Sequence, residues 1–170
     1  MRHINKTQVL IGVVVLFLGS FIYLVDRPPD QTYFVKSSPV KITLFNTIPN
    51  VFGFIGGSLP EFIHVFSFIL ITAGLLFCNE RGYLVICLSW FLLDAAAEVG
   101  QYFTTWYSKI IPDWFTGIPF LENTESYFFH GTFDFIDLVA IAVGTLIAYF
   151  VLLTTNKRRN WHEERKKWIR

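Results

Sequence analysis

Six of the polar side chains within the apolar segments of this chain could form a site: His64, Asp94, Glu98, Gln101, Asp134 and Asp137. Asp94 and Glu98 are four residues apart, and Gln101 follows Glu98 by three, so all three share one face of a helix. Carboxylates and imidazoles can exchange protons, hydrogen-bond a ligand or hold a cation. These residues are therefore the first candidates for a site, and the elements that carry them decide whether they meet.

The composition excludes most classes of soluble protein. Of 170 residues, 53% are hydrophobic and only 16% are charged, whereas about 25% of an average soluble domain is charged. Two cysteines are too few for a disulfide scaffold, and the net charge of +1 gives no reason to expect a nucleic-acid partner. The length fits one domain. We therefore predict a single-domain polytopic membrane protein, with the lipid bilayer as its expected partner.

Four apolar segments are each close to the length of about 20 residues that crosses a bilayer as a helix. They cover residues 9–25, 61–78, 83–103 and 133–155 approximately, and none alternates like a barrel strand. The sequence predicts an all-α fold of four transmembrane helices, with Ser58 as the cap of the second and Glu61 completing its capping box. A retained first helix is favoured over a cleaved signal peptide, because no small-residue cleavage site precedes Asp26-Arg27-Pro28-Pro29.

The basic residues predict the orientation. With four spans, both termini and the short turn at 79–82 lie on one side of the membrane. That side holds ten of the 14 basic residues: Arg2, Lys6, Arg81, Lys157, Arg158, Arg159, Arg165, Lys166, Lys167 and Arg170. Because cytoplasmic loops are rich in Lys and Arg, we expect cytoplasmic termini, outer loops at 26–60 and 104–132, and a basic cytoplasmic tail at 157–170. We interpret that tail as a stop-transfer cluster of basic residues that fixes the topology. The alternative is a surface helix that binds anionic lipid or a partner protein.

This topology brings the six polar residues to a similar depth. The third helix enters at the cytoplasmic face, so Asp94 lies about 16 Å and Glu98 about 22 Å along it. The second and fourth helices begin at the outer face, close to His64 and to Asp134 and Asp137 respectively. Ionisable residues inside spans are costly and mark functional sites by default. We therefore predict an outward-facing acidic and polar binding pocket, with an interhelical polar clamp as the alternative.

Four carboxylates cannot all stay ionised and unpaired in such a place. Either some are protonated and hydrogen-bond as acids, or a cation neutralises them. A metal site made of His64, Glu98, Asp137 and His130 is a weaker candidate, because no HExxH or CxxC spacing accompanies these residues. The chain also has no G-x-S-x-G or phosphate-loop motif. We predict no cofactor and identify no catalytic residue.

Small residues on the fourth helix predict close helix packing. Ala140, Gly144 and Ala148 repeat every four residues and continue the face that begins at Asp137. Such a stripe lets a neighbouring helix approach closely. We expect the third and fourth helices to pack together, with their carboxylates facing each other or flanking a shared pocket.

The order of these residues resembles a known family. The pattern E-x-x-Q at Glu98–Gln101, then G-x-F-x-x-x-D at Gly131–Asp137 followed by Gly144, is similar to the VanZ-like family of small bacterial membrane proteins. The helix start Pro60-Glu61-Phe62-Ile63-His64 resembles that family's D-K-x-x-H. The family's Asp-Lys is Pro60-Glu61 here, its loop arginine is Thr132, and its asparagine is Ile141. These departures remove the two basic residues that would grip an anionic group.

The resemblance implies a protein of the bacterial cytoplasmic membrane with a role in the cell envelope. Its type member is associated with teicoplanin resistance, so we expect action on envelope components or on susceptibility to glycopeptide-like agents. A lipid or lipid-linked ligand would be the partner. Two alternatives remain: a non-catalytic subunit held by polar residues among other membrane subunits, and an enzyme of lipid-linked substrates, although no motif favours an enzyme.

Overall fold

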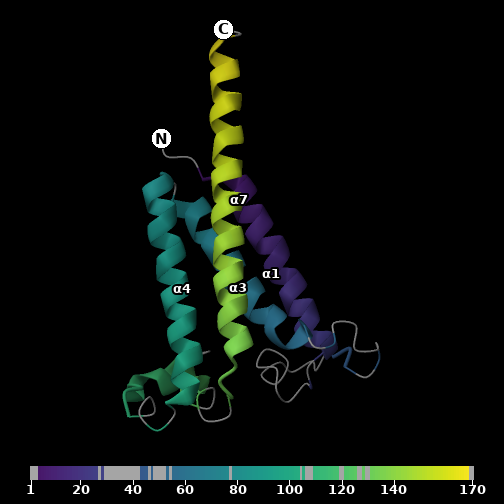
Figure 1. The fold of residues 1–170 in the computed structure, drawn as a ribbon, viewed down its shortest axis with the longest axis vertical. Coiled ribbons are helices and arrows are strands. Elements are labelled where there is room, and N and C mark those ends of the chain that lie inside the picture. Colours follow the sequence, from purple (N-terminus) through teal and green to yellow (C-terminus); the bar gives the residue numbers. More distant parts are fainter. Residues whose placement is uncertain are drawn as a thin grey trace.

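The computed structural model is a bundle of four long helices (Figure 1). It describes residues 4–26, 28, 43–45, 47, 53, 55–76, 78–103, 105, 109–118, 121–125, 128 and 131–168, with 157–168 only as the course of a helix. The helices are α1 (Lys6–Asp26), α3 (Ile55–Leu76), α4 (Glu80–Tyr102) and α7 (Phe135–Trp168), with the short 3-10 helices η2 (Asp113–Gly117) and η3 (Leu121–Asn123) before α7. All four long helices contain a stretch long and apolar enough to span a membrane, which confirms the predicted all-α multi-pass fold.

The bundle is built around α3, which packs against each of the other three long helices. Its side chains Val65, Ile69 and Leu70 are fully buried, and α7 meets them with Ile141 and Leu152. In Figure 1, α1 and α4 lie on opposite flanks of the central pair, α3 and α7. Any site shared by α1 and α4 must therefore lie across a face of α3.

The outer surface of the bundle is as apolar as its interior. Leu84, Leu88 and Leu92 lie along α4 at four-residue spacing and are all exposed. In water such a stripe would be unfavourable, whereas lipid chains solvate it as well as a protein core does. The exposed apolar faces therefore fit the lipid-facing surface of a membrane bundle.

Because lipid removes the hydrophobic drive for helix association, close packing between α1 and α3 depends on small residues. A methyl group at Gly12 would stand 2.8 Å from the carbonyl oxygen of Ser67, and one at Gly19 would stand 2.6 Å from Ile63 Cγ2. On α3, a methyl group at Gly74 would stand 2.7 Å from Val9. Glycine at these three positions lets the two helices stay in contact along most of their length.

The end of the bundle that carries the N-terminus is held by a buried amide. Gln8 on α1 is completely buried, and its Nε2 donates to Thr155 Oγ1 of α7 at 2.9 Å. The same Nε2 lies 3.4 Å from the hydroxyl of Tyr83 on α4. Hydrogen bonds between polar side chains are a main specific attraction between helices in lipid. Gln8 therefore ties three helices together at the end opposite the predicted pocket.

The start of the second helix and the end of the last helix differ most from the sequence prediction. The second helix begins at Ile55, several residues before the predicted cap at Ser58, so that cap prediction is wrong. The reason is a turn at Gly53, which adopts a positive φ of 50°. The carbonyl oxygen of Gly53 accepts the N–H of Gly56, so the helix can begin directly after this turn. The last helix continues to Trp168, beyond the predicted end at 155, and its extension protrudes from the bundle (Figure 1).

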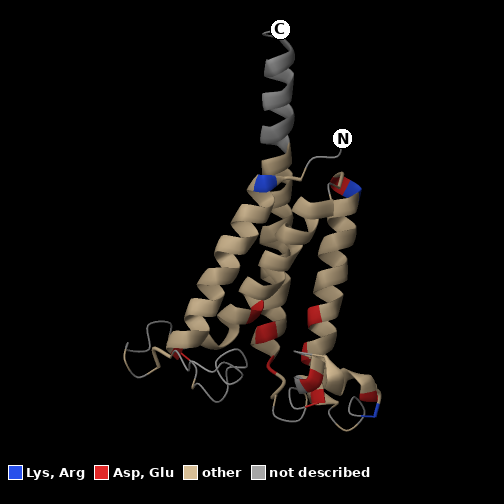
Figure 2. Cartoon of the chain, turned by 180° about the vertical axis from the view of Figure 1, so that it is seen from behind, with Lys and Arg blue, Asp and Glu red and all other residues tan. Residues whose placement is uncertain are grey.

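The charges are distributed unequally along the bundle. Figure 2 shows Lys and Arg of the helices at the end where the N-terminus lies, and most helical Asp and Glu towards the other end. Figure 1 shows the N- and C-termini at the same end, as an even number of spans requires. The arrangement agrees with the charge asymmetry that predicts cytoplasmic termini.

Candidate functional site

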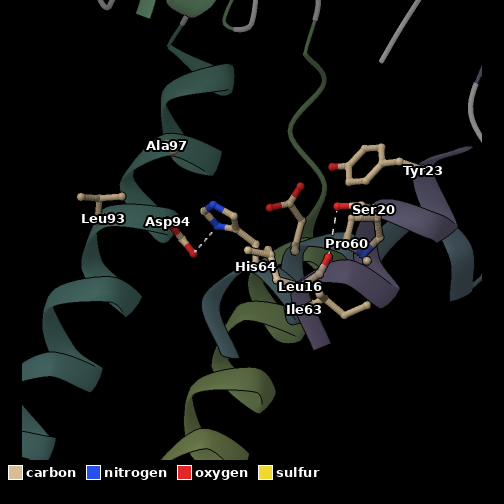
Figure 3. A pocket seen from close by; sticks show the side chains of 11 residues that line it. Leu16, Ser20, Tyr23, Pro60, Ile63, His64, Leu93, Asp94 and Ala97 are labelled. Carbon is tan, nitrogen blue, oxygen red and sulfur yellow. Dashed lines mark hydrogen bonds and ion pairs between the residues drawn. The ribbon is translucent and has the colours of Figure 1, made fainter. Parts of the chain in front are cut away.

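A pocket of about 370 Å³ lies in the acidic half of the bundle, between α1, α3 and α4 (Figure 3). One wall is formed by Leu16, Ser20 and Tyr23 of α1, and the opposite wall by Leu93 and Ala97 of α4. The part contributed by α3 includes Pro60, Glu61, Ile63 and His64. The pocket therefore combines apolar walls with polar and ionisable groups on the helix that joins them.

The polar centre of the pocket is an imidazole paired with a carboxylate. His64 Nδ1 lies 3.2 Å from Asp94 Oδ2, linking α3 to α4. The side chain of His64 is 45% exposed, whereas that of Asp94 is only 5% exposed. A buried carboxylate on one ring nitrogen fixes the orientation and tautomer of the ring and leaves the other nitrogen to face a ligand.

Aromatic rings support this histidine from within the bundle. The ring of Phe68, one turn further along α3, lies 4.5 Å from the His64 ring, and Trp90 of α4 lies 6.3 Å from it. Phe68 and Trp90 stack on each other at 4.9 Å. The indole of Trp90 is fixed in turn by a hydrogen bond to Thr72 Oγ1 at 3.1 Å. Because the rings pack and are anchored, the His64 side chain has little freedom to turn away from Asp94.

Glu61 is a pocket residue that sequence reasoning assigned only to a helix cap. It lies within the second turn of α3, faces the pocket, and is mostly buried. It is close enough to interact electrostatically with four other groups, which are His64, Asp94, Glu98 and Asp137. The spacing of Glu61 and His64 could have predicted that Glu61 faces the pocket, because residues three apart share a helix face.

The wall contributed by α1 could not be anticipated from motifs. Ser20 and Tyr23 stand among apolar residues without charge or recognisable spacing. Ser20 lines the pocket and donates its hydroxyl hydrogen to the carbonyl oxygen of Leu16 at 3.2 Å, so its oxygen keeps lone pairs that can accept a hydrogen bond. Only the close α1–α3 packing at Gly19 and Ile63 brings these hydroxyls to the site.

Glu98, Gln101 and Asp134 form a second polar group, which holds helices together. Glu98 is only 2% exposed. Its Oε1 accepts the backbone N–H of Asp134 at 2.8 Å, and its Oε2 accepts from Gln101 Nε2 at 3.3 Å. Asp134 itself caps α7 by accepting the N–H of Ile136 at 2.8 Å. This geometry is that of the interhelical clamp, the alternative to a pocket role for these three residues.

Asp137 lies between the two polar groups without joining either by a hydrogen bond. Its Oδ1 is buried and has no hydrogen-bond partner among the described residues. It is close enough to interact electrostatically with Glu61 and with Glu98. The six predicted site residues therefore divide into a pocket pair (His64 and Asp94), a clamp (Glu98, Gln101 and Asp134) and this intermediate carboxylate.

The small-residue stripe of α7 packs on α3 at its central glycine. A methyl group at Gly144 would stand 2.7 Å from Val65 Cγ1 and 2.9 Å from the carbonyl oxygen of Phe62. Ala148, one turn on, is completely buried, and Ala140 is partly buried. The helix that approaches at Gly144 is therefore α3, whereas the sequence analysis expected the third helix in the bundle, α4. Helix α4 also contacts α7, through the Glu98 clamp.

The proposed metal set is not assembled among the described residues. No group of three or more His, Cys, Asp and Glu in this part of the chain is arranged to hold a metal ion. His64 and Glu98 belong to different polar groups, and His130 lies outside the described residues. Glu98 accepts from an amide and a backbone N–H, and Asp94 contacts the imidazole of His64.

No family model, curated protein or solved structure matches this chain. The class of the protein therefore rests on its own fold and site. It is a multi-pass helical membrane protein with a partly polar pocket between α1, α3 and α4 in one half of the bundle.

Proposed function

We propose that this chain is a VanZ-like protein of a bacterial cytoplasmic membrane that binds the headgroup of a lipid or lipid-linked envelope component in its outer half. The observation that carries the proposal is the pocket of about 370 Å³ with the His64–Asp94 pair in it. Binding there would let the protein act on envelope components or on susceptibility to glycopeptide-like agents, as the motif resemblance implies.

The lining of the pocket supports an amphiphilic ligand. Leu16, Ile63 and Leu93 provide apolar surface, while Glu61 and His64 provide hydrogen-bonding groups between them. His64 lies nine residues after the start of α3, which is about 14 Å of helix. A headgroup at that depth could keep its chain in the surrounding lipid. A ligand without an apolar part would gain nothing from the apolar walls.

Filling the pocket tests the proposal. Ala97→Leu adds bulk to the wall from α4, whereas Ala96→Leu, one residue away, adds the same bulk at an exposed position. We expect the purified protein to retain one lipid class above its share of the membrane, measured by mass spectrometry after extraction with the surrounding bilayer. Ala97→Leu should lose that enrichment, and Ala96→Leu should keep it. Equal lipid profiles for all three proteins would refute the pocket as a ligand site.

The same pair of variants tests the cellular role. In a strain that lacks its own copy, restoring the wild-type chain should change the inhibitory concentration of a glycopeptide. Ala97→Leu should fail to restore that change at equal membrane abundance, and Ala96→Leu should restore it. No difference between the empty strain and the wild-type strain would reject the envelope-susceptibility role.

A further inference from the structure

The carboxylate of Glu61 accepts no hydrogen bond from the residues that the structure describes, although it lies close enough to His64 to interact with it electrostatically. It faces the pocket and is mostly buried, yet no hydrogen bond or ion pair to another described residue satisfies it. Its neighbour Asp94 differs, because the imidazole of His64 lies 3.2 Å away. A carboxylate without a donor is costly inside a membrane. The pocket therefore presents one acceptor group that a ligand could complete.

The charge of the pocket restricts what that ligand can be. Among the described residues that line it, two are carboxylates, one is histidine and none is lysine or arginine. An anionic headgroup such as a phosphate monoester would meet Glu61 and Asp94 without any fixed cation to offset the repulsion. A neutral hydroxyl can hydrogen-bond to Glu61, but only a cation stabilises the ionised form of that carboxylate.

Two further acceptors accompany Glu61. A positively charged group in the pocket disfavours the imidazolium form of His64; with Nδ1 donating to Asp94, Nε2 of the neutral ring then carries a lone pair. The hydroxyl oxygen of Ser20 also keeps its lone pairs, because its hydrogen is donated to Leu16. In Figure 3, Ser20 belongs to the wall from α1, opposite Leu93 and Ala97 of α4, with His64 between the two walls. A group that offers three N–H donors and one positive charge would match this set.

We propose that the pocket recognises an amphiphile with a primary ammonium headgroup, whose N–H donors are accepted by Glu61, Ser20 and His64. This inference rests on the proposed function and adds the charge and donor class of the ligand. Charge-assisted hydrogen bonds are the strong ones, and they gain strength in a site screened from water. The tail of the amphiphile would remain among the apolar walls and the lipid chains.

Trp90 provides a reporter for the test, since its ring lies 6.3 Å from that of His64. The protein is labelled with 5-fluorotryptophan, reconstituted in phosphatidylcholine vesicles and titrated with oleylamine while fluorine NMR is recorded. The Trp90 signal is assigned with Trp90→Phe. We expect oleylamine to shift this signal, and oleyl alcohol and oleate to leave it unchanged at equal mole fraction. Oleyl-trimethylammonium keeps the charge but has no N–H donor, so we expect it to bind far more weakly than oleylamine.

A matched pair of substitutions assigns the effect to Glu61. Glu61→Gln keeps the size of the side chain and removes its charge, and we expect about tenfold weaker oleylamine binding, as one charge-assisted hydrogen bond becomes neutral. Glu80→Gln makes the same change at an exposed position on α4, at the other end of the bundle, and should bind like wild type. The melting temperatures of both variants are recorded alongside.

The outcomes distinguish a failure of the ammonium preference from a failure of the proposed lipid-binding function. If oleyl alcohol, oleate or oleyl-trimethylammonium shifts Trp90 as strongly as oleylamine, and Ala97→Leu blocks the shift, the ammonium preference is wrong and the lipid pocket stands. Undiminished oleylamine binding by folded Glu61→Gln would likewise overturn the preference. If no amphiphile shifts Trp90 and the lipid profiles are equal for Ala97→Leu and wild type, both proposals fail. The ligand series does not depend on Glu61→Gln, so it decides the matter even if that variant does not fold.

Discussion

At the scale of single residues, two carboxylates one helical turn apart have different surroundings. Asp94 meets His64 beside the pocket, whereas Glu98 accepts the backbone N–H of Asp134 at the start of α7. Both are almost completely buried. Their spacing in the sequence predicts that both lie on one face of a helix. The hydrogen-bond partner of each, however, depends on which neighbouring helix lies opposite its own turn. Burial alone therefore does not separate a ligand site from a clamp.

The clamp makes a prediction about stability. Glu98→Leu leaves the Asp134 N–H and the Gln101 amide without their acceptor, and a lost buried partner costs about 1–3 kcal/mol. We expect a lower melting temperature and less folded protein after detergent extraction. Glu98→Gln keeps a carbonyl oxygen for the Asp134 N–H, so it should stay nearer to wild type. Equal melting temperatures for Glu98→Leu and wild type would show that these bonds contribute nothing to the fold.

Sequence reasoning overlooked Glu61 for a specific physical reason. A Ser–x–x–Glu spacing at Ser58–Glu61 is the usual signature of a helix start, which supplies a local role for the carboxylate. The turn at Gly53 begins the helix earlier, so Ser58 and Glu61 are both inside it and the carboxylate is left to face the pocket. A local interpretation thus concealed a residue whose neighbours are distant in sequence.

At the scale of helices, the apolar segments and their number were predictable, and the packing partners were not. The stripe at Gly144 indicates only that some helix comes close, because every helix in lipid is apolar on most of its surface. Which helix it is follows from the whole arrangement: α3 is central and meets α1, α4 and α7. For the same reason, the contribution of Ser20 and Tyr23 to the pocket could not be anticipated from the sequence of α1.

The packing at Gly144 predicts a strong effect of added bulk. A side chain there must displace Val65 or the backbone of Phe62, since even a methyl group would stand 2.9 Å from the Phe62 carbonyl oxygen. Overpacking of this kind costs about 1–3 kcal/mol, so Gly144→Leu should lower the melting temperature and the folded yield. Val143→Leu, at an exposed position on the same helix, should have little effect. Similar losses in both variants would indicate general intolerance of α7 rather than close contact at Gly144.

At the scale of the whole molecule, the fold separates two kinds of polar interaction along its length. Gln8 joins α1, α4 and α7 at the end with the N-terminus, and the pocket lies in the half where most helical acids gather (Figure 2). The end with the termini is therefore held by the hydrogen bonds of Gln8, while the other half combines the Glu98 clamp with a pocket that Glu61 faces. The proposed ligand source, the outer leaflet, depends on which of these ends faces the cytoplasm.

The distribution of basic residues predicts how the chain is oriented in the membrane. Ten of the 14 basic residues belong to the side with the termini and the turn before α4, and such an excess marks the cytoplasmic face. In a background with Cys78→Ser and Cys87→Ala, Lys36→Cys and Asp113→Cys should react with a membrane-impermeant maleimide on intact spheroplasts. Glu80→Cys and Arg170→Cys should react only after permeabilisation. Labelling of Glu80→Cys from outside, with Asp113→Cys protected, would place the pocket in the cytoplasmic half. Ligands from the outer leaflet could not then reach Glu61, and the proposed function would have to be abandoned together with the orientation.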